Sequence, residues 1–401
     1  MEEWDVVVVG AGPAGATAAR IAAAEGARTL LLDRAVFPRY KTCGGGLIGV
    51  SARHVPAGVL ERTVESRIDS IVFTRRSRAT VRVRGPEPML LLVRREPFDA
   101  ALADEAVAAG ARFRDGVAVR SLAEDPGDGA VTLTTSAGRI RARVVVGADG
   151  SGGRVGRYVG VRMAGVDLGL EDELPAEPDE AAARTVRLDW GRGPGSYAWV
   201  FPKAASLTVG VIERRGRADA TRRYLAAWRA DRGLADAEPA RSSGHLTQWR
   251  EAGSPLARGR VLVAGEAAGL LEPWTREGIS YALRSGAWAG RAAAAAAGGG
   301  RPEAAIAGYE ERVRRELGRE QEVGALLLAA FERWPWAVHT ALRRSRRARR
   351  FFVDFCRGEA GLTDLTRHRA LLALLRVAAR PGARPSARAS VSDGASPNAE
   401  R

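Results

Sequence analysis

The fold is decided by one stretch, residues 5–15, which reads Asp5-Val6-Val7-Val8-Val9-Gly10-Ala11-Gly12-Pro13-Ala14-Gly15. Its four consecutive valines predict a buried parallel strand. The small residues of 16–24 predict a helix, so the Gly-x-Gly-x-x-Gly spacing stands between a strand and a helix, as a dinucleotide-binding turn requires. Such glycines allow a tight turn, close approach of the backbone to a pyrophosphate and close packing of the helix, whose N-terminus adds partial positive charge.

A second strand and an acidic residue complete this unit. Residues 29–32 predict the strand, and Asp33 ends it, 18 residues after Gly15. At that position an acidic side chain accepts hydrogen bonds from the ribose hydroxyls of a bound dinucleotide. The residues of this unit that we expect to hold the cofactor are Gly10, Gly12, Pro13, Ala14, Gly15, Asp33 and Arg34.

Composition limits the class of protein. The 401 residues are 46% hydrophobic and 27% charged, which is typical of a globular chain. No apolar run reaches the ~20 residues of a membrane-spanning helix, and the acidic start does not resemble a signal peptide. Two cysteines, Cys43 and Cys356, form no disulfide framework, so we expect a cytoplasmic protein. The four histidines have no metal-ligand spacing, and no metal site is expected.

The net charge of +15 is carried mostly by arginine and favours anionic partners. A compositional bias toward Ala, Gly and Arg explains the charge equally well. No nucleic-acid-binding motif is present, so nucleic acid is not expected as a partner. The sequence does not indicate the oligomeric state.

Further elements follow along the chain. The alternation of apolar and polar residues predicts antiparallel strands over 71–93 and 184–213. Residues 111–142 predict a β-meander with a turn at 126–129, and 143–147 and 261–265 predict parallel-type strands. Helices are predicted over 96–110, from about residue 279 and through much of 303–378. The composition of the end of the chain, from 381, is typical of disorder.

Two later motifs indicate whether the bound dinucleotide is FAD or NAD. Gly147-Ala148-Asp149-Gly150 and Gly265-Glu266-Ala267-Ala268 each end a predicted strand. With the first motif they resemble, in order, the motifs of the flavoprotein superfamily typified by p-hydroxybenzoate hydroxylase, and the resemblance implies FAD. Glu266 replaces the usual aspartate at the ribityl chain, and Gly153 replaces a serine. The residues that this resemblance adds to the cofactor site are Arg95, Asp149, Gly150, Gly265 and Glu266.

Three further stretches resemble the geranylgeranyl reductase family. They are Pro194-x-x-Tyr197-x-Trp199-x-Phe201-Pro202-Lys203, Cys43-Gly44-Gly45-Gly46 and the run 273–279. The resemblance adds Cys43, Gly44, Gly45, Gly278 and Ile279 to the flavin site. Arg276 stands where the family usually has glycine, which predicts crowding or extra charge at the flavin edge.

The implied fold is α/β, with a discontinuous Rossmann-like FAD-binding domain and an inserted antiparallel sheet. We expect the FAD-binding domain at 1–70, 96–160 and 255–300, and a substrate-binding sheet at 71–95 and 161–254. A helical region is expected at 301–380 and a disordered tail at 381–401.

The implied activity is saturation of C=C bonds in a polyprenyl chain, with FAD reduced by NAD(P)H or a small carrier. Cys43, Tyr197 and Trp199 are the candidate catalytic residues, and Tyr197, Trp199 and Phe201 the candidate substrate residues. An isolated alkene needs a hydride, a proton and exclusion of water, which aromatic side chains favour. The three rings could equally be plain core, and Cys43 a small buried residue of a glycine-rich loop.

Other interpretations stay open. A monooxygenase on the same fold is one alternative, whereas a halogenase is disfavoured because Trp-x-Trp-x-Ile-Pro is missing. A lipid-binding flavoprotein without turnover is another. Arg39 and Lys41 could approach the cofactor phosphates or be ordinary loop cations. The arginines of 343–350 and the phenylalanines that follow could rest on an anionic membrane, or form a solvated helix with its rings in the core.

Overall fold

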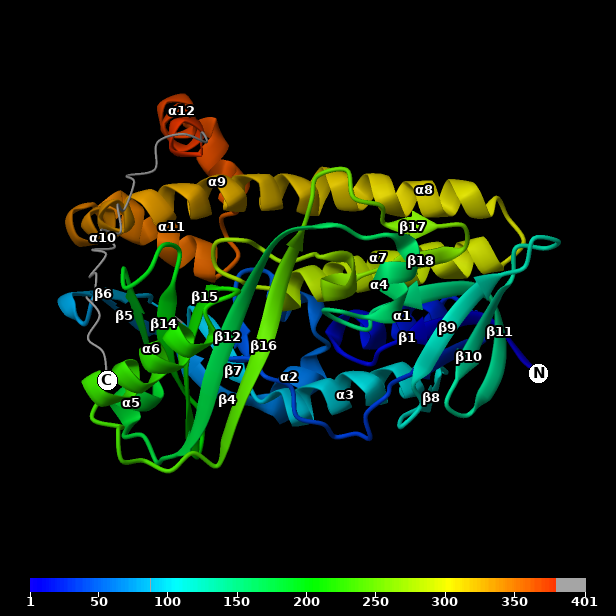
Figure 1. Ribbon diagram of the computed structural model, residues 1–401, viewed down its shortest axis with the longest axis horizontal. Coiled ribbons are helices and arrows are strands. Elements are labelled where there is room, and N and C mark those ends of the chain that lie inside the picture. Colours follow the sequence, from blue (N-terminus) through cyan, green and yellow to red (C-terminus); the bar gives the residue numbers. More distant parts are fainter. Residues whose placement is uncertain (87, 380–401) are drawn as a thin grey trace, which may run out of the picture.

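The computed structural model describes residues 1–86 and 88–379. The predicted disordered tail, 381–401, lies outside the described residues. Figure 1 shows a large sheet with β1 and β11 at one end of an elongated molecule and a second sheet with β5, β6 and β14 at the other. Two long strands, β12 (Met163–Pro175) and β16 (Arg241–Arg250), run between the two ends.

The first sheet is parallel at its centre. The central strands run in the order β18 (Val261–Val263), β11 (Gly138–Gly147), β1 (Glu2–Val9), β2 (Thr29–Leu32) and β8 (Arg112–Arg114). Strands β17 (Ala257–Arg258), β10 (Val131–Thr135) and β9 (Val119–Glu124) add antiparallel pairs. The predicted meander and the predicted strand 143–147 share β11, whose first part pairs with β10 and whose last residues pair with β18.

Helices cover this sheet. They are α1 (Pro13–Ala24), α3 (Arg95–Ala108), α4 (Arg154–Val159), α7 (Ile279–Ala297) and α8 (Pro302–Val313). After a short π-helix, Arg314–Gly318, α9 (Arg319–Arg333) continues toward the second sheet, where Phe331 packs with Trp190 (Figure 1). Two glycines let α7 lie directly on α1, because a Cβ at Gly286 would come 2.2 Å from the Ala14 carbonyl oxygen and one at Gly290 2.4 Å from that of Ala18. The helix predicted from residue 279 is therefore a close partner of the glycine-rich turn.

The second sheet has seven strands. Their order is β16, β12, β15 (Ser206–Arg214), β14 (Tyr197–Pro202), β13 (Thr185–Trp190), β5 (Ser70–Arg75) and β6 (Arg78–Arg84). All pairs are antiparallel except β13 with β5. Helix α6 (Ala218–Asp231), which is not among the predicted elements, contributes Tyr224 and Trp228 to the cluster that covers one face.

The remaining elements are small. Strands β3 (Gly46–Leu47), β7 (Leu90–Val93) and β4 (Val64–Ile68) form a third sheet, so the predicted alternation over 71–93 is divided between two sheets. The other helices are α2 (Ala57–Thr63), α5 (Glu180–Ala183), α10 (Pro335–Arg344), α11 (Arg346–Cys356) and α12 (Arg369–Ala378). Among the described residues, no helix has the length and apolar character needed to cross a membrane.

Candidate active site

The three glycine-containing motifs meet at one edge of the parallel sheet. Strands β1, β11 and β18 lie side by side and parallel, so their carboxyl ends are adjacent. A Cβ at Gly10, whose φ is +99°, would come 2.3 Å from the Ala148 carbonyl oxygen. A Cβ at Gly265 would come 2.8 Å from the Cβ of Ala14. Only glycine fits at these close approaches, which bring the first motif against the second and the third.

Asp33 determines the shape of the glycine-rich turn. Its Oδ2 accepts a hydrogen bond from the Ala11 N–H at 2.8 Å, and its Oδ1 accepts one from the Ala35 N–H at 2.9 Å. The side chain is buried, and the neighbouring Arg34 is exposed. A ribose contact of Asp33 stays a prediction, whereas its contact with the turn is direct.

A cluster of two arginines and one carboxylate lies beside this turn. Asp99, fully buried, accepts two hydrogen bonds from Arg95 at 2.8 and 2.7 Å and pairs with Arg39 at 3.0 Å. A Cβ at Gly12 would lie 3.5 Å from Nη2 of Arg39 and 4.0 Å from Nη2 of Arg95. Two guanidinium groups against one carboxylate leave a positive charge at the turn, as a diphosphate requires.

In the second motif, residues 147–150, the side chain of Asp149 binds the backbone at the start of α4. Its Oδ2 accepts a hydrogen bond from the Val155 N–H at 3.0 Å, and burial raises the pKa of this carboxyl. A Cβ at Gly153 would lie 2.3 Å from the Asp149 carboxyl group. This contact explains the glycine that replaces the usual serine. Gly150, φ +76°, turns the chain immediately after Asp149.

Glu266 of the third motif pairs with a residue that the sequence interpretation missed. Nε2 of His245, on β16, lies 2.8 and 3.0 Å from the two carboxylate oxygens of Glu266. Burial alone would raise the pKa of Glu266, but the His245 hydrogen bond and the charges of His245, Lys41 and Arg95 together lower it below the usual value. The carboxylate is thus kept ionised at the end of β18.

The Cys43 loop, residues 43–46, lies against three rings that we name the aromatic stripe: Tyr197, Trp199 and Phe201. The ring centroids are 5.8 Å apart for Tyr197 and Trp199 and 6.2 Å apart for Trp199 and Phe201. A Cβ at Gly44 would lie 2.6 Å from two ring carbons of Phe201. The intervening residues of β14, Ala198 and Val200, belong instead to the cluster on the α6 side. The stripe therefore faces the Cys43 loop.

The run 273–279 closes the site from the α7 side. The Tyr197 hydroxyl donates to the Thr275 carbonyl oxygen at 2.8 Å. Arg276, φ +59°, donates to Asp167 at 2.7 and 2.9 Å and to the Gly195 carbonyl oxygen at 3.1 Å. Its charge is therefore matched by a carboxylate on β12, although glycine is usual here. Gly278 precedes α7, and Ile279 shares a cluster with Cys43.

The residues present fit FAD. In the described part of the chain, Nη1 of Arg39, Oδ1 of Asp149 and Nε1 of Trp199 are buried and have no hydrogen-bond partner. A buried polar atom left without a partner costs about 1–3 kcal/mol, so polar groups of a bound cofactor would satisfy these atoms. They belong, respectively, to the arginine cluster, the second motif and the stripe.

Comparison with known proteins agrees with this geometry. A family described as FAD binding domain matches residues 3–320. Digeranylgeranylglycerophospholipid reductase 1 of Methanothermobacter thermautotrophicus is 30% identical over 345 residues, covering 79% of this chain and 84% of that protein. Geranylgeranyl diphosphate reductase of Rhodobacter capsulatus is 30% identical over 317 residues, covering 75% and 77%. The chain belongs to the geranylgeranyl reductase family.

A solved structure shares the fold of this family member. The crystal structure of a geranylgeranyl bacteriochlorophyll reductase-like protein from Thermoplasma acidophilum matches with a TM-score of 0.77 and 19% identity, covering 94% of this chain and all of that one. The predicted family, α/β fold and FAD-dependent oxidoreductase class are confirmed.

The structure gathers the predicted site residues around one region, at the edge of the parallel sheet and the adjoining Cys43 loop. The residues missed are Asp99, Asp167, Glu171 and His245. Asp99 could have been found, because it lies one helical turn after Arg95 on a predicted helix. The other three lie on β12 and β16, which are not among the predicted strands.

Proposed function

We propose that this protein is an FAD-dependent reductase that saturates C=C bonds of a geranylgeranyl-type polyprenyl chain. The chain would belong to a lipid, a prenyl diphosphate, a quinone or a related natural product. The observation that carries the proposal is the contact between the aromatic stripe and the Cys43 loop, within the group of FAD motifs. Relatives whose names include a glycerophospholipid and a diphosphate support this substrate class.

Reduced FAD supplies the hydride in this chemistry. The stripe lines the place of the alkene with apolar surface, excludes water and offers π faces to a carbon that acquires positive charge. Trp199 is 8% exposed, and its ring lies over the backbone of Gly210, which has no side chain to displace it. The Tyr197 hydroxyl is engaged by Thr275, and burial raises the pKa of Tyr197 to about 12, so we assign Tyr197 to the lining rather than to proton donation.

Cys43 is the proposed reactive residue of its loop. Its backbone N–H is fixed by Glu171 at 2.7 Å, its Sγ accepts from the Gly45 N–H at 3.4 Å, and the Arg95 guanidinium contacts the thiol. These contacts support a fixed position of the thiol within the Cys43 loop. The electron donor is proposed to be NAD(P)H or a small reduced carrier.

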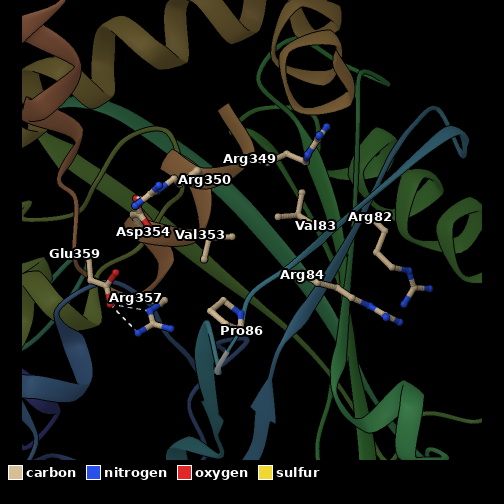
Figure 2. A pocket seen from close by; sticks show the side chains of 10 residues that line it. All are labelled: Arg82, Val83, Arg84, Pro86, Arg349, Arg350, Val353, Asp354, Arg357 and Glu359. Atoms are coloured by element: carbon tan, nitrogen blue, oxygen red, sulfur yellow. Dashed lines mark hydrogen bonds and ion pairs between the residues drawn. The ribbon is translucent and has the colours of Figure 1, made fainter. Parts of the chain in front are cut away.

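We also propose peripheral contact with an anionic membrane through the basic end of the molecule. A cavity of about 530 Å³ lies between β6 and α11. Figure 2 shows the side chains that line it, among them Arg82, Arg84, Arg349, Arg350 and Arg357 and the carboxylates of Asp354 and Glu359. Five arginines against two carboxylates support attraction to anionic lipid. Phe352 and Phe355 pack against the core, so the arginines would carry the contact. Co-sedimentation with phosphatidylglycerol but not phosphatidylcholine vesicles tests this proposal.

The test of the activity is anaerobic. The holoenzyme is reduced with dithionite and mixed with geranylgeranyl diphosphate or a digeranylgeranyl phospholipid, and product masses are measured. We expect a gain of two hydrogens per saturated bond, strongly reduced in Trp199→Ala and largely kept in Trp228→Phe, a tryptophan on the α6 side. Products that appear only under oxygen, with an added oxygen atom, would favour a monooxygenase instead.

A further inference from the structure

A buried carboxylate lies beside the aromatic stripe and has no place in the mechanism described so far. In the register of the sheet, Trp199 on β14 is opposite Gly210 on β15, and Gly210 is opposite Glu171 on β12. Residues directly opposite each other in antiparallel strands point to the same face. A Cβ at Gly210 would lie 2.1 Å from the Trp199 ring, so the indole covers Gly210 and extends toward β12. Glu171 is thus the next side chain in this row.

One oxygen of Glu171 is bound and the other is not. Oε1 accepts hydrogen bonds from the Cys43 N–H at 2.7 Å and from the Tyr40 hydroxyl at 3.1 Å. Oε2 is buried and has no hydrogen-bond partner within the described residues, and the whole side chain is 1% exposed. Leaving such an oxygen without a partner costs about 1–3 kcal/mol, so a structural anchor for the Cys43 loop explains Oε1 but not Oε2.

Hydroxyl groups connect Glu171 with the edge of the sheet. The Tyr40 hydroxyl lies 2.8 Å from Oγ of Ser243, and Oγ1 of Thr42 donates to the same Oγ at 3.0 Å. Thr42 also reaches the carbonyl oxygen of Gly244, an exposed residue, at 3.5 Å. The series runs from a fully buried carboxyl to the surface, and each of its hydroxyls can both donate and accept a proton.

We propose that Glu171 is the acid that protonates the prenyl double bond, and that Tyr40, Ser243 and Thr42 return a proton to it from solvent. The proposal rests on the proposed function. The π bond of the alkene breaks as one carbon forms a C–H bond with the hydride from reduced flavin. The other carbon forms a C–H bond with the proton from Oε2, whose O–H bond breaks and leaves a carboxylate. The alkene is reduced and the flavin is oxidised. The relay then returns a proton to the carboxylate at Oε1 through the Tyr40 hydroxyl, and a half-turn of the carboxyl group exchanges Oε1 and Oε2 before the next turnover.

The electrostatic surroundings of Glu171 suit an acid at neutral pH. Burial, and then the negative charge of Glu173, raise its pKa to about 7, against the opposing effects of the Cys43 N–H and the charge of Lys203. Tyr40 and Cys43 face it from the loop, and His245 lies two residues beyond Ser243 on β16. Glu171 therefore keeps its proton below about pH 7, the condition for a general acid.

The strand offers a matched control. Glu173 lies on the same face of β12, but its two oxygens are bonded to the Thr208 hydroxyl at 3.1 and 2.9 Å. Glu171→Gln keeps an oxygen for the Cys43 N–H and removes the acid, and Glu173→Gln makes the same change where both oxygens have a partner. Each variant is compared with wild type as the FAD-loaded protein.

The experiment measures single-turnover oxidation of dithionite-reduced holoenzyme by geranylgeranyl diphosphate, without oxygen, across pH and in H₂O and D₂O. We expect Glu171→Gln to slow oxidation about 10²-fold or more and to lose the pH dependence. We expect Glu173→Gln to keep a pH dependence with a lower midpoint, because the charge of Glu173 no longer raises the pKa of Glu171. Tyr40→Phe is expected to slow reprotonation between turnovers, which is measured as a lower rate of multiple turnover with excess dithionite. In the infrared spectrum of the oxidised holoenzyme, the carboxylic acid C=O absorption that titrates near pH 7 includes Glu277 as well as Glu171. We expect this absorption to decrease in Glu171→Gln and not in Glu173→Gln.

The outcomes are distinguishable. Unchanged rate and pH profile in Glu171→Gln, or the absence of a titrating band that belongs to Glu171, would overturn the acid assignment while the proposed function stands. Loss of turnover in Cys43→Ser with a normal Glu171→Gln would assign the proton to the thiol. If wild type itself is not oxidised by any prenyl substrate, the proposed function fails and this proposal fails with it.

Discussion

The contact between the Cys43 loop and the stripe predicts a specific steric cost for Gly44→Ala. The new Cβ would lie 2.6 Å from two ring carbons of Phe201, about 0.8 Å closer than the 3.4 Å at which ordinary contact begins. Overpacking of this kind costs typically about 1–3 kcal/mol. We expect the free energy of unfolding of the holoprotein, measured by urea denaturation, to fall by that amount.

Two variants make the prediction specific. A Cβ at Gly46 meets nothing closer than 3.8 Å, so Gly46→Ala is expected to be neutral or to stabilise by up to about 1 kcal/mol through the unfolded chain. Phe201→Leu removes the ring carbons that the methyl group added at position 44 would touch, so the double variant should recover most of the loss. Strict additivity of Gly44→Ala and Phe201→Leu, or equal effects at positions 44 and 46, would refute the contact.

Three further predictions concern the cofactor region and pH. Gly10→Ala should prevent retention of FAD, measured as flavin content after purification, because its Cβ would lie 2.3 Å from the Ala148 carbonyl oxygen at a φ of +99°; normal flavin content would contradict the packing of the motifs. Asp99→Asn should destabilise the apoprotein by about 3–5 kcal/mol, since Arg95 loses its charged partner, and saturating FAD should recover part of this loss in urea denaturation. Burial raises the pKa of Glu277 from 4.5 to about 7, so the folded state holds a proton that the unfolded chain releases. Stability should fall as pH rises from about 4.5 to 7, and less steeply in Glu277→Gln; identical pH profiles would contradict the assignment.

The sequence predicts the fold correctly where neighbouring signals for strand, turn and helix agree with one another. The valines before Gly10, the helix after Pro13 and the strand before Asp33 form a unit whose sequence signals all agree. β12 is not among the predicted strands, and its acidic residues Asp167 and Glu171 occupy the polar positions of its alternation, where the sequence suggests exposure although both are buried. These residues are polar because Glu171 binds the Cys43 loop and Asp167 binds Arg276, so the strand that was not predicted carries the acid proposed here.

The candidate site also has features that depend on local sequence and features that do not. Motifs with fixed spacing carried the cofactor residues, since each motif depends on a local turn, and the contacts of these residues with FAD stay predictions. The pair of His245 with Glu266 and the row from Trp199 to Glu171 depend on strand register across the second sheet. A shift of register by one residue would move these side chains to the other face, and nothing local in the sequence determines that register.

The central claim is that an alkene, and not oxygen, is the oxidant of the reduced flavin. The direct measurement is the absorbance of dithionite-reduced holoenzyme after anaerobic mixing with geranylgeranyl diphosphate or with its fully saturated analogue. The account predicts flavin oxidation with the unsaturated substrate only, with one flavin oxidised for each C=C bond reduced. Flavin that stays reduced with both compounds, and is oxidised only when oxygen is admitted, would contradict it.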